Sequence, residues 1–331
     1  MSRRGFHRAT LFLAIAALSH GAIAQKAPTP QAAPWPSKAV KLLVGFPGGS
    51  SPDLMARTLA EPLSKALGQP VIVENHPGAS GNIAANLVAQ STDQHTLGIM
   101  INGNLTIAKL LNPRTPYDPA KDLTPISLIG TAPLVLAVPA SSNAADAQAF
   151  FAAARNGADK WNYGTPGNGT VAHVGMELLK SKTQITAVHV PYPGNPQVIT
   201  AMIGGQIQMS LLPPGLAMPQ VRAGKLKAIG VTSAGRSSLV PEVPSLSEGG
   251  VPGFQLEIWN AVAGPSTLPK PIVARLSNLF SEIARSPEIR QKLFNQGWQV
   301  AGTSAEGLAN RIKQDTDLLG GVISARGIKT E

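Results

Sequence analysis

Short apolar runs alternate with stretches of helical periodicity between residues 38 and 101. A helix is predicted over 54–67, where leucine and methionine recur at helical spacing before Gly68, and Pro62 is expected to interrupt and kink it. A second helix is predicted over 81–90. Strands are predicted over 38–46, 70–75 and 95–101. Because strands that alternate with helices need crossover connections, this pattern predicts an α/β unit with a mostly parallel sheet.

The same alternation restarts after residue 160 and predicts a second α/β unit. Its strands are expected over 161–164, 185–190, 206–212 and 226–232. Its helices are expected over 171–180, over 196–203 and through 221. Two apolar stretches punctuated by proline, 123–142 and 254–269, suit a strand that passes from one unit to the other and a strand that returns. From Pro271 onward the chain is predicted to be mainly helical, and one helix there is expected to be capped by Ser286, with Pro287 first and Gly297 after its end.

Residues 1–24 have the parts of an export signal. A basic start with Arg3, Arg4 and Arg8 precedes a short apolar run and a small-residue cleavage site before Gln25. The apolar run is too short to span a bilayer. The start also fits the twin-arginine pattern, so Sec and twin-arginine export both stay open. Residues 25–36 read as a tether rich in proline and alanine. We expect an exported, periplasmic protein that does not insert into the membrane after signal cleavage.

Composition narrows the chemistry. The 331 residues contain no cysteine, which excludes disulfides, thiol nucleophiles and cysteine metal sites. Loss of residues 1–24 removes three arginines and no acid, so the remaining chain is still basic. Aromatic residues make up only 5% of the chain and are not interleaved with basic clusters, which argues against nucleic acid. A small anionic ligand is the better partner.

The sequence FPGGSSPD, residues 46–53, lies where a predicted strand passes into a predicted helix. Ser51 is expected to be the N-cap, Pro52 the first helical residue, and Asp53 a favourable charge at the positive end of the helix dipole. Gly48 and Gly49 permit a tight turn to which a ligand can come close. Free amides at such a turn suit an anion, and plain helix capping is the alternative explanation.

The sequence WNYGTPGNGTVAH, residues 161–173, repeats this design in the second unit. We expect the two glycine-rich loops to face each other across a cleft. Charge-assisted hydrogen bonds contribute about 1.5–3 kcal/mol each, and micromolar binding needs about 8 kcal/mol. Several such donors therefore suffice for a carboxylate without an arginine.

Residues 167–172 also match the dinucleotide pattern G-x-G-x-x-A. That pattern requires an acidic residue about twenty positions later. Asp and Glu are absent from 178–241, whereas this stretch contains several lysines and arginines. The sequence therefore argues against a nucleotide, and no cofactor is expected.

Catalytic motifs are sparse. After the signal, histidines occur at 76, 95, 173 and 189 without metal-ligand spacing, and neither a nucleophile elbow nor a Walker A loop occurs. His173 and Tyr192 are expected either to border a ligand or to pack, and Trp259 is expected in the core. We therefore expect no catalytic or metal site. The alternative is an exported hydrolase or isomerase that acts on a small carboxylate through His173 with Ser50 or Thr170.

Several long motifs resemble, in the same order, those of the Bug or TctC-like solute receptors of tripartite tricarboxylate transport systems. They span residues 35–89, 115–130, 161–173, 190–194, 223–254 and 286–297. The resemblance covers nearly all of the chain after the signal, and it is specific because many motifs agree together.

The resemblance implies a type II periplasmic binding protein fold, in which two lobes with mostly parallel sheets are joined by two crossing strands. Lobe 1 would comprise 37–133 plus 262–331, and lobe 2 would comprise 134–261. Hinge closure would trap a small organic carboxylate for delivery to membrane components of the transporter. The residues implied in ligand binding are Phe46, Gly48, Gly49, Ser50, Ser51, Asp53, Asn102, Asn104, Thr165, Gly167, Asn168, Gly169, Thr170, His173 and Tyr192.

The chain also departs from the family pattern. The family's first loop usually reads FPPGGSTD, so Pro52 here removes an amide and a hydroxyl that other members offer. Residues 101–111 differ from the common version rich in threonine and serine, and 211–214 read LLPP where an acid or amide is frequent. These changes point to an altered ligand with an apolar portion.

Overall fold

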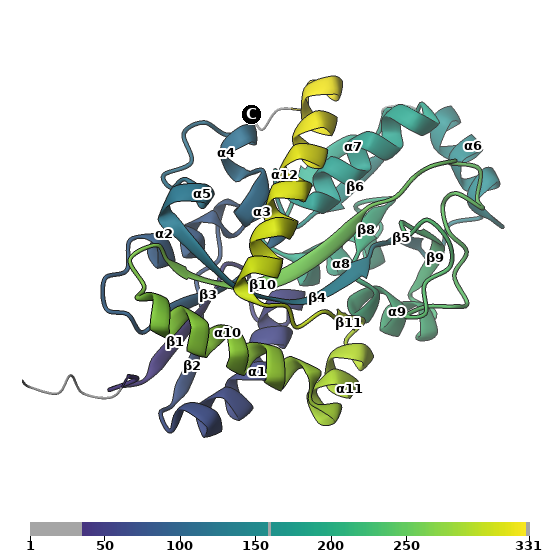
Figure 1. Ribbon diagram of the computed structural model, residues 1–331. Helices are drawn as coiled ribbons and strands as arrows, with labels where there is room; N and C mark the ends of the chain where they lie inside the picture. Colours follow the sequence, from purple (N-terminus) through teal and green to yellow (C-terminus); the bar gives the residue numbers. More distant parts are fainter. Residues whose placement is uncertain (1–34, 158–159, 329–331) are drawn as a thin grey trace, which may run out of the picture. The chain divides into compact units, whose positions relative to one another are not determined.

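Two long antiparallel strands, β4 (Leu123–Pro133) and β10 (Glu257–Pro265), run through the centre of the fold (Figure 1). They pair with each other along the whole of β10. After Leu134 the chain continues from β4 into β5 (Val135–Pro139), which belongs to another sheet. The passing strand and its return partner expected from the sequence are thus confirmed.

The computed structural model describes residues 35–157 and 160–328. The expected signal over 1–24 and the tether through residue 34 lie outside these ranges. Among the described residues, no helix combines the length and the apolar character needed to cross a membrane.

The first lobe is built on a six-stranded sheet in the order β11-β4-β10-β3-β1-β2. β1 (Val40–Val44) pairs in parallel with β2 (Val71–Asn75) and β3 (Thr96–Ile101), as the sequence pattern predicts. β10 and β11 (Gln299–Val300) add antiparallel pairs. The helices of this lobe are α1 (Ser51–Leu67), η1 (Ala79–Gly81), α2 (Asn82–Ala89), α3 (Asn102–Thr106), α4 (Ala108–Leu111), α5 (Pro119–Asp122), α10 (Lys270–Arg285), α11 (Pro287–Asn295) and α12 (Ala305–Arg326).

The second lobe contains two smaller sheets. One has the order β8-β5-β9 with antiparallel pairs, and the other is the parallel pair β6-β7. Its elements after β5 are α6 (Ala147–Gly157), β6 (Asn162–Thr165), α7 (Val171–Thr183), β7 (Val188–Pro191), α8 (Asn195–Ile203), β8 (Ser210–Leu212), α9 (Pro214–Arg222) and β9 (Leu226–Val231). The lobe boundaries expected from the sequence stay a prediction, because β10 runs continuously across residue 262.

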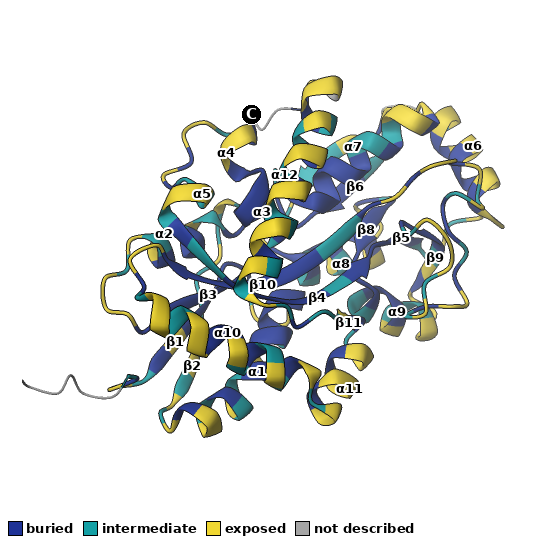
Figure 2. Ribbon diagram, in the orientation of Figure 1, coloured by how far each residue is buried: buried dark blue, intermediate teal, exposed yellow. Residues whose placement is uncertain are grey.

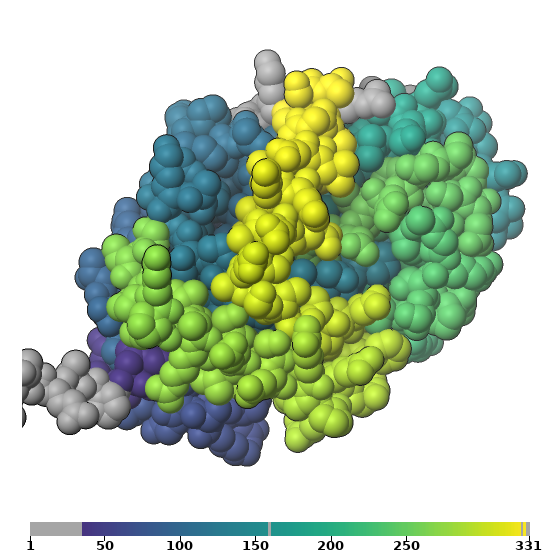
Figure 3. Space-filling model, in the orientation of Figure 1, coloured from purple at the N-terminus to yellow at the C-terminus, as the bar shows by residue number. Residues whose placement is uncertain are grey.

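Helices cover both faces of the six-stranded sheet. On one face, α1, α10 and α11 bury side chains such as Leu59, Phe280 and Leu293 against the strands. On the other face, α2 and α12 pack around Trp259, a fully buried core residue whose Nε1 donates to Asp315 Oδ2 at 2.5 Å. Figure 2 shows the buried strands between helices whose outer faces are exposed. In the space-filling view, α12 lies across this face of the fold, where it packs against β4 (Figure 3).

Three local expectations need correction. Ser51 is the first residue of α1 and Ser50 holds the N-cap position, so the assignment of Ser51 as N-cap is wrong. Pro62 lies inside α1 without interrupting it. Ser286 does precede α11, but its hydroxyl donates to Ile283 O instead of capping, because α10 ends directly at Ser286.

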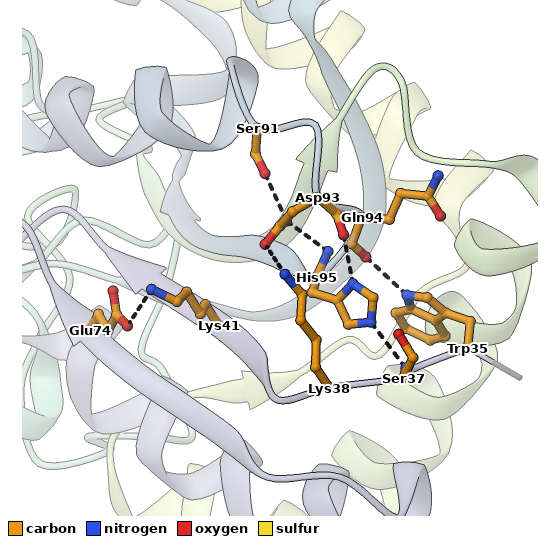
Figure 4. A network of polar contacts seen from close by, with 9 residues as sticks. All are labelled: Trp35, Ser37, Lys38, Lys41, Glu74, Ser91, Asp93, Gln94 and His95. Atoms are coloured by element: carbon orange, nitrogen blue, oxygen red, sulfur yellow. Dashed lines mark hydrogen bonds and ion pairs between the residues drawn. The ribbon is translucent and has the colours of Figure 1, made fainter. Parts of the chain in front are cut away.

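Residues 35–38, at the start of the described chain, form hydrogen bonds and an ion pair with residues 93–95, which precede β3 (Figure 4). Trp35 Nε1 donates to Gln94 O at 3.0 Å, and the Ser37 amide donates to His95 Nε2 at 3.1 Å. Lys38 Nζ pairs with the Asp93 carboxylate at 3.2 Å. These contacts bind the chain to the amino ends of β1 and β3.

Gly45→Ala is expected to destabilise the protein, because a Cβ at this position would lie 2.4 Å from Gly81 Cα, where backbone meets backbone. Overpacking of this kind costs about 1–3 kcal/mol. Gly321→Ala is the matched control: it has open space around it in α12, and the gain in helix propensity should raise stability by about 0.5–1 kcal/mol. Urea unfolding of both variants checks the prediction, and equal stabilities would contradict it.

Candidate ligand-binding site

A cavity of ≈ 40 Å³ lies at the carboxyl ends of strands from both lobes. Phe46 and Asn102, which line it, follow β1 and β3 in the first lobe. Pro166 and Pro213, which also line it, follow β6 and β8 in the second lobe. Ligands of open α/β sheets bind at such carboxyl edges.

Four helices begin beside this cavity. Ser51, Val171 and Asn195 are the first residues of α1, α7 and α8, and Pro213 immediately precedes α9. The first amides of a helix have no partner within the helix, and the dipole makes this end positive. Helix ends from both lobes therefore provide a favourable environment for an anion.

Buried polar side chains at the cavity contain atoms without a partner. Among the described residues, no hydrogen-bond partner is found for Ser50 Oγ, Asn102 Oδ1, Asn195 Oδ1 and Asn260 Nδ2. Each of these residues is at most 6% exposed. Because an unpaired buried polar atom costs about 1–3 kcal/mol and is rare in proteins, this cluster indicates a site built to bind a polar molecule.

The rest of the cavity wall is apolar. Within the described chain, no residue with a charged side chain lines the cavity. Phe46, Ile101, Leu134, Leu211 and Ile258 contribute aromatic or aliphatic surface. The LLPP segment noted in the sequence supplies part of this wall through Leu211 and Pro213.

Asp53 holds the first loop together and does not line the cavity. Its carboxylate is 1% exposed and accepts hydrogen bonds from the Gly49 amide at 2.9 Å, from Arg57 Nε at 3.0 Å and from Asn75 Nδ2 at 2.9 Å. Asn75 Nδ2 also donates to Phe46 O. Burial by itself raises the pKa of Asp53. The hydrogen bonds from Arg57, Gly49 and Asn75 outweigh this effect, so the pKa lies below its usual value. The carboxylate is therefore ionised and committed to the turn.

Thr170 and Thr165 shape the second loop. Thr170 is the N-cap of α7: its hydroxyl accepts from the His173 amide at 3.3 Å and donates to Gly167 O at 2.9 Å. Thr165 Oγ1 accepts from the Gly167 amide at 3.2 Å and lies 2.6 Å from His189 Nε2. Gly167 has a φ of +122°, a backbone conformation that other residues rarely adopt.

Three stacked rings, those of Tyr163, His189 and His173, pack beside the second loop. The rings of His173 and His189 are stacked at 4.3 Å, and His189 stacks on Tyr163 at 4.8 Å. His173 Nδ1 accepts a hydrogen bond from the Gly169 amide at 3.2 Å, which requires an unprotonated nitrogen. Desolvation lowers the pKa of His173, and desolvation together with the charge of His173 lowers the pKa of His189 to about 4.

The two lobes touch at a seam beside the cavity. Ser80 Oγ in η1 donates to Asn168 O of the second loop at 2.6 Å. Ala79 and Ser80 have φ values of 46° and 57°, in the left-handed region, and Asn104 Nδ2 holds this turn by donating to Ser80 O at 3.0 Å. A second cavity of ≈ 150 Å³ lies along the seam and is lined by Ser80, Asn104, Asn168 and Gly169.

The structure brings the two predicted loops to one place but gives their residues different tasks. Phe46, Ser50, Ser51, Asn102 and Thr170 line the first cavity, and Asn104, Asn168 and Gly169 line the second. The remaining predicted residues either shape or pack the loops: Gly48, Gly49, Asp53, Thr165, Gly167, His173 and Tyr192, whose amide donates to Thr165 O. Their direct contact with a ligand stays a prediction.

Sequence reasoning missed Ser80, Asn195 and Asn260. Asn195 begins the helix after the VPYPG motif, which is a local signal that was available. Asn260 lies on the return strand among apolar residues, so its polar character was the only indication. Ser80 faces a loop 88 positions away, and no local pattern shows such a contact.

The architecture and the uncharged cavity at helix starts define a solute-binding receptor of the two-lobed periplasmic type. A family model described as tripartite tricarboxylate transporter family receptor (TctC) matches residues 55–328. The chain belongs to this family, which confirms the resemblance noted in its motifs. Among the described residues, no group of three or more His, Asp or Glu is arranged to hold a metal ion.

Individual relatives agree with this assignment. A protein of the tcbD-tcbE intergenic region of Pseudomonas sp. strain P51 is 33% identical over 285 residues, which cover 86% of this chain and 84% of the relative. The structure of MatC from Rhodopseudomonas palustris with bound malate matches with a TM-score of 0.83 and 30% identity, covering 87% of this chain and all of MatC. R. palustris Rpa4515 with adipate matches with a TM-score of 0.86 and 29% identity, covering 89% and 99% of the two chains.

Acidification is expected to weaken the second lobe through its histidines. Because the folded-state pKa values of His173 and His189 are lowered, the unfolded chain binds protons first, so the stability present above pH 6.5 is lost as the pH falls toward 4. His189→Gln keeps a polar group beside Thr165 but cannot titrate. It should flatten the pH dependence of the free energy of unfolding by about 1 kcal/mol over this range. Urea unfolding at a series of pH values tests this, and parallel curves for both proteins would refute it.

Proposed function

We propose that this protein captures a small organic carboxylate in the cavity between its lobes and presents it to the membrane components of a transporter. The observation that carries the proposal is the cluster of four buried, unpartnered polar atoms beside four helix starts. The helix starts and the donors Ser50 Oγ and Asn260 Nδ2 would bind an anion without a cationic side chain, and the two amide oxygens would bind a polar group of the same molecule. The carboxylates malate and adipate in two related structures support the ligand class.

The position of the site between the lobes fits capture by closure. Ser50 and Asn102 come from the first lobe, Thr170 and Asn195 come from the second, and Asn260 lies on the crossing strand β10. A ligand that contacts both lobes binds the closed form better than the open form, so binding favours closure. The family's role and the expected export signal support a periplasmic location for this activity.

The geometry also favours a receptor over the enzyme alternative. An activated hydroxyl needs an adjacent base within hydrogen-bond reach. Within the described chain Ser50 Oγ has no such partner, and Thr170 Oγ1 donates to a backbone carbonyl. His173 Nδ1 is occupied by the Gly169 amide, and its ring stacks on His189. In the described chain, Ser50 Oγ therefore has no adjacent base, Thr170 Oγ1 is used in the loop, and neither hydroxyl forms a nucleophile and base pair with His173.

A thermal-shift screen of mono-, di- and tricarboxylates and aromatic acids tests the proposal. A ligand at one hundred times its Kd is expected to stabilise the protein by about 2.7 kcal/mol. NMR of the best ligand after prolonged incubation should show it unchanged and bound one to one. Catalytic appearance of a new product would favour the enzyme instead, and failure of all these acids to bind would reject the carboxylate receptor.

Asn260→Ala locates the site. Loss of its buried Nδ2 donor should weaken the best carboxylate about tenfold, because a hydrogen bond to a charged group contributes about 1.5 kcal/mol or more. Asn86→Ala is the matched control: Asn86 Oδ1 is likewise buried without a partner in the described chain, but it lies on α2 away from the cavity lining. Calorimetric titration should show unchanged affinity for the control. Equal affinities for both variants would place the site elsewhere.

A further inference from the structure

The side-chain amide of Asn102 has a fixed orientation. Its Nδ2 donates to Glu257 O on β10 at 3.1 Å, which identifies the other terminal atom as the oxygen. The residue is 1% exposed and lines the cavity. Within the described chain, its Oδ1 is buried and no donor reaches it.

An amide oxygen accepts hydrogen bonds and cannot donate one. An ionised carboxylate also only accepts, so it satisfies Ser50 Oγ, Asn260 Nδ2 and the helix amides but leaves Asn102 Oδ1 unpaired. A second amide oxygen at the cavity, Asn195 Oδ1, has the same need. The cavity therefore requires hydrogen-bond donors from its ligand as well as acceptors.

The charges around the cavity determine which kind of donor fits. The two acidic residues next to lining residues in the chain are engaged elsewhere: Asp53 with Arg57 and the Gly49 amide, and Glu257 with Arg311 at 3.1 Å. An ammonium group would be buried beside positive helix ends without an acidic side chain of the described cavity lining to pair with, which is costly. A hydroxyl or amide N–H supplies the donor without that cost.

We propose that the ligand, within the carboxylate-receptor function above, carries a neutral hydrogen-bond donor that binds Asn102 Oδ1. A hydroxy-substituted carboxylate, or one with an amide N–H, has this chemistry. Asn102 thereby becomes a specificity-determining residue, which selects hydroxy acids against both their deoxy and their amino counterparts. The carbon skeleton packs against the apolar wall formed by Phe46, Leu211 and Ile258.

Three series of acids with matched carbon skeletons test this with the wild-type protein. They are malate, succinate and aspartate; mandelate, phenylacetate and phenylglycine; and lactate, propionate and alanine. In every series that binds, calorimetric titration should give the hydroxy acid an affinity at least about tenfold above that of the other two, since a buried acceptor left unpaired is costly. A deoxy or amino acid that binds as tightly as its hydroxy counterpart overturns the proposal. If none of the acids in the three series binds, the hydroxy-acid proposal is rejected. Binding of a carboxylate outside these series would then still support the receptor function.

Asn102→Ala assigns the effect to this residue. The variant should lose the discrimination, with the ratio of hydroxy-acid to deoxy-acid affinity falling to about one or two, while the deoxy acid still binds. Asn86→Ala, with its buried unpartnered oxygen away from the cavity lining, should retain the wild-type ratio. An unchanged ratio in Asn102→Ala overturns the assignment. Should this variant fail to fold, the wild-type series above decides the matter without it.

Discussion

The antiparallel pairing of β4 with β10 is the constraint on which the rest of the structure depends. It carries the chain out of the first sheet into the second lobe and returns it alongside the outgoing strand. Loops that follow β1 and β3 thereby meet loops that follow β6 and β8, although they are far apart in sequence. The same pair also supplies Asn260 to the candidate cavity, so one crossing strand both connects the lobes and lines the cavity.

Under the proposed function, the cavity binds negative charge through dipoles alone, because no charged side chain of the described chain lines it. A buried cation would carry its own desolvation cost and would need a permanent partner when no ligand is present. Backbone amides at helix starts and neutral amide side chains have no such requirement. The ionised residues Asp53 and Arg57, both on α1, form an ion pair that stabilises the turn before this helix. Such a site discriminates by hydrogen-bond direction, because net attraction is similar for many acids.

Local sequence patterns predicted most strands and helices of this protein. Roles that depend on contacts between distant residues could not be predicted. Apolar periodicity and turn residues placed the strands, most helices and both glycine-rich loops, because these depend on neighbours in the sequence. The role of Asp53 on α1 could not be predicted, since it depends on Asn75 at the end of β2, 22 positions later. The N-cap was predicted at Ser51 and lies one position earlier, at Ser50, because the conformation of the whole turn decides where the helix begins. Ser80 and Asn260 acquire their places only when distant segments come together.

The contacts of Trp35 fix the start of the described chain at one edge of the six-stranded sheet. Trp35 lies beside Gln94 and His95, just before β1 and β3 begin, whereas Phe46 and Asn102 follow the other ends of the same strands. The length of the sheet thus separates Trp35 from the candidate cavity that Phe46 and Asn102 line. A label or substitution at residues 35–38 therefore lies across the sheet from the candidate cavity and leaves the lining of that cavity unaltered.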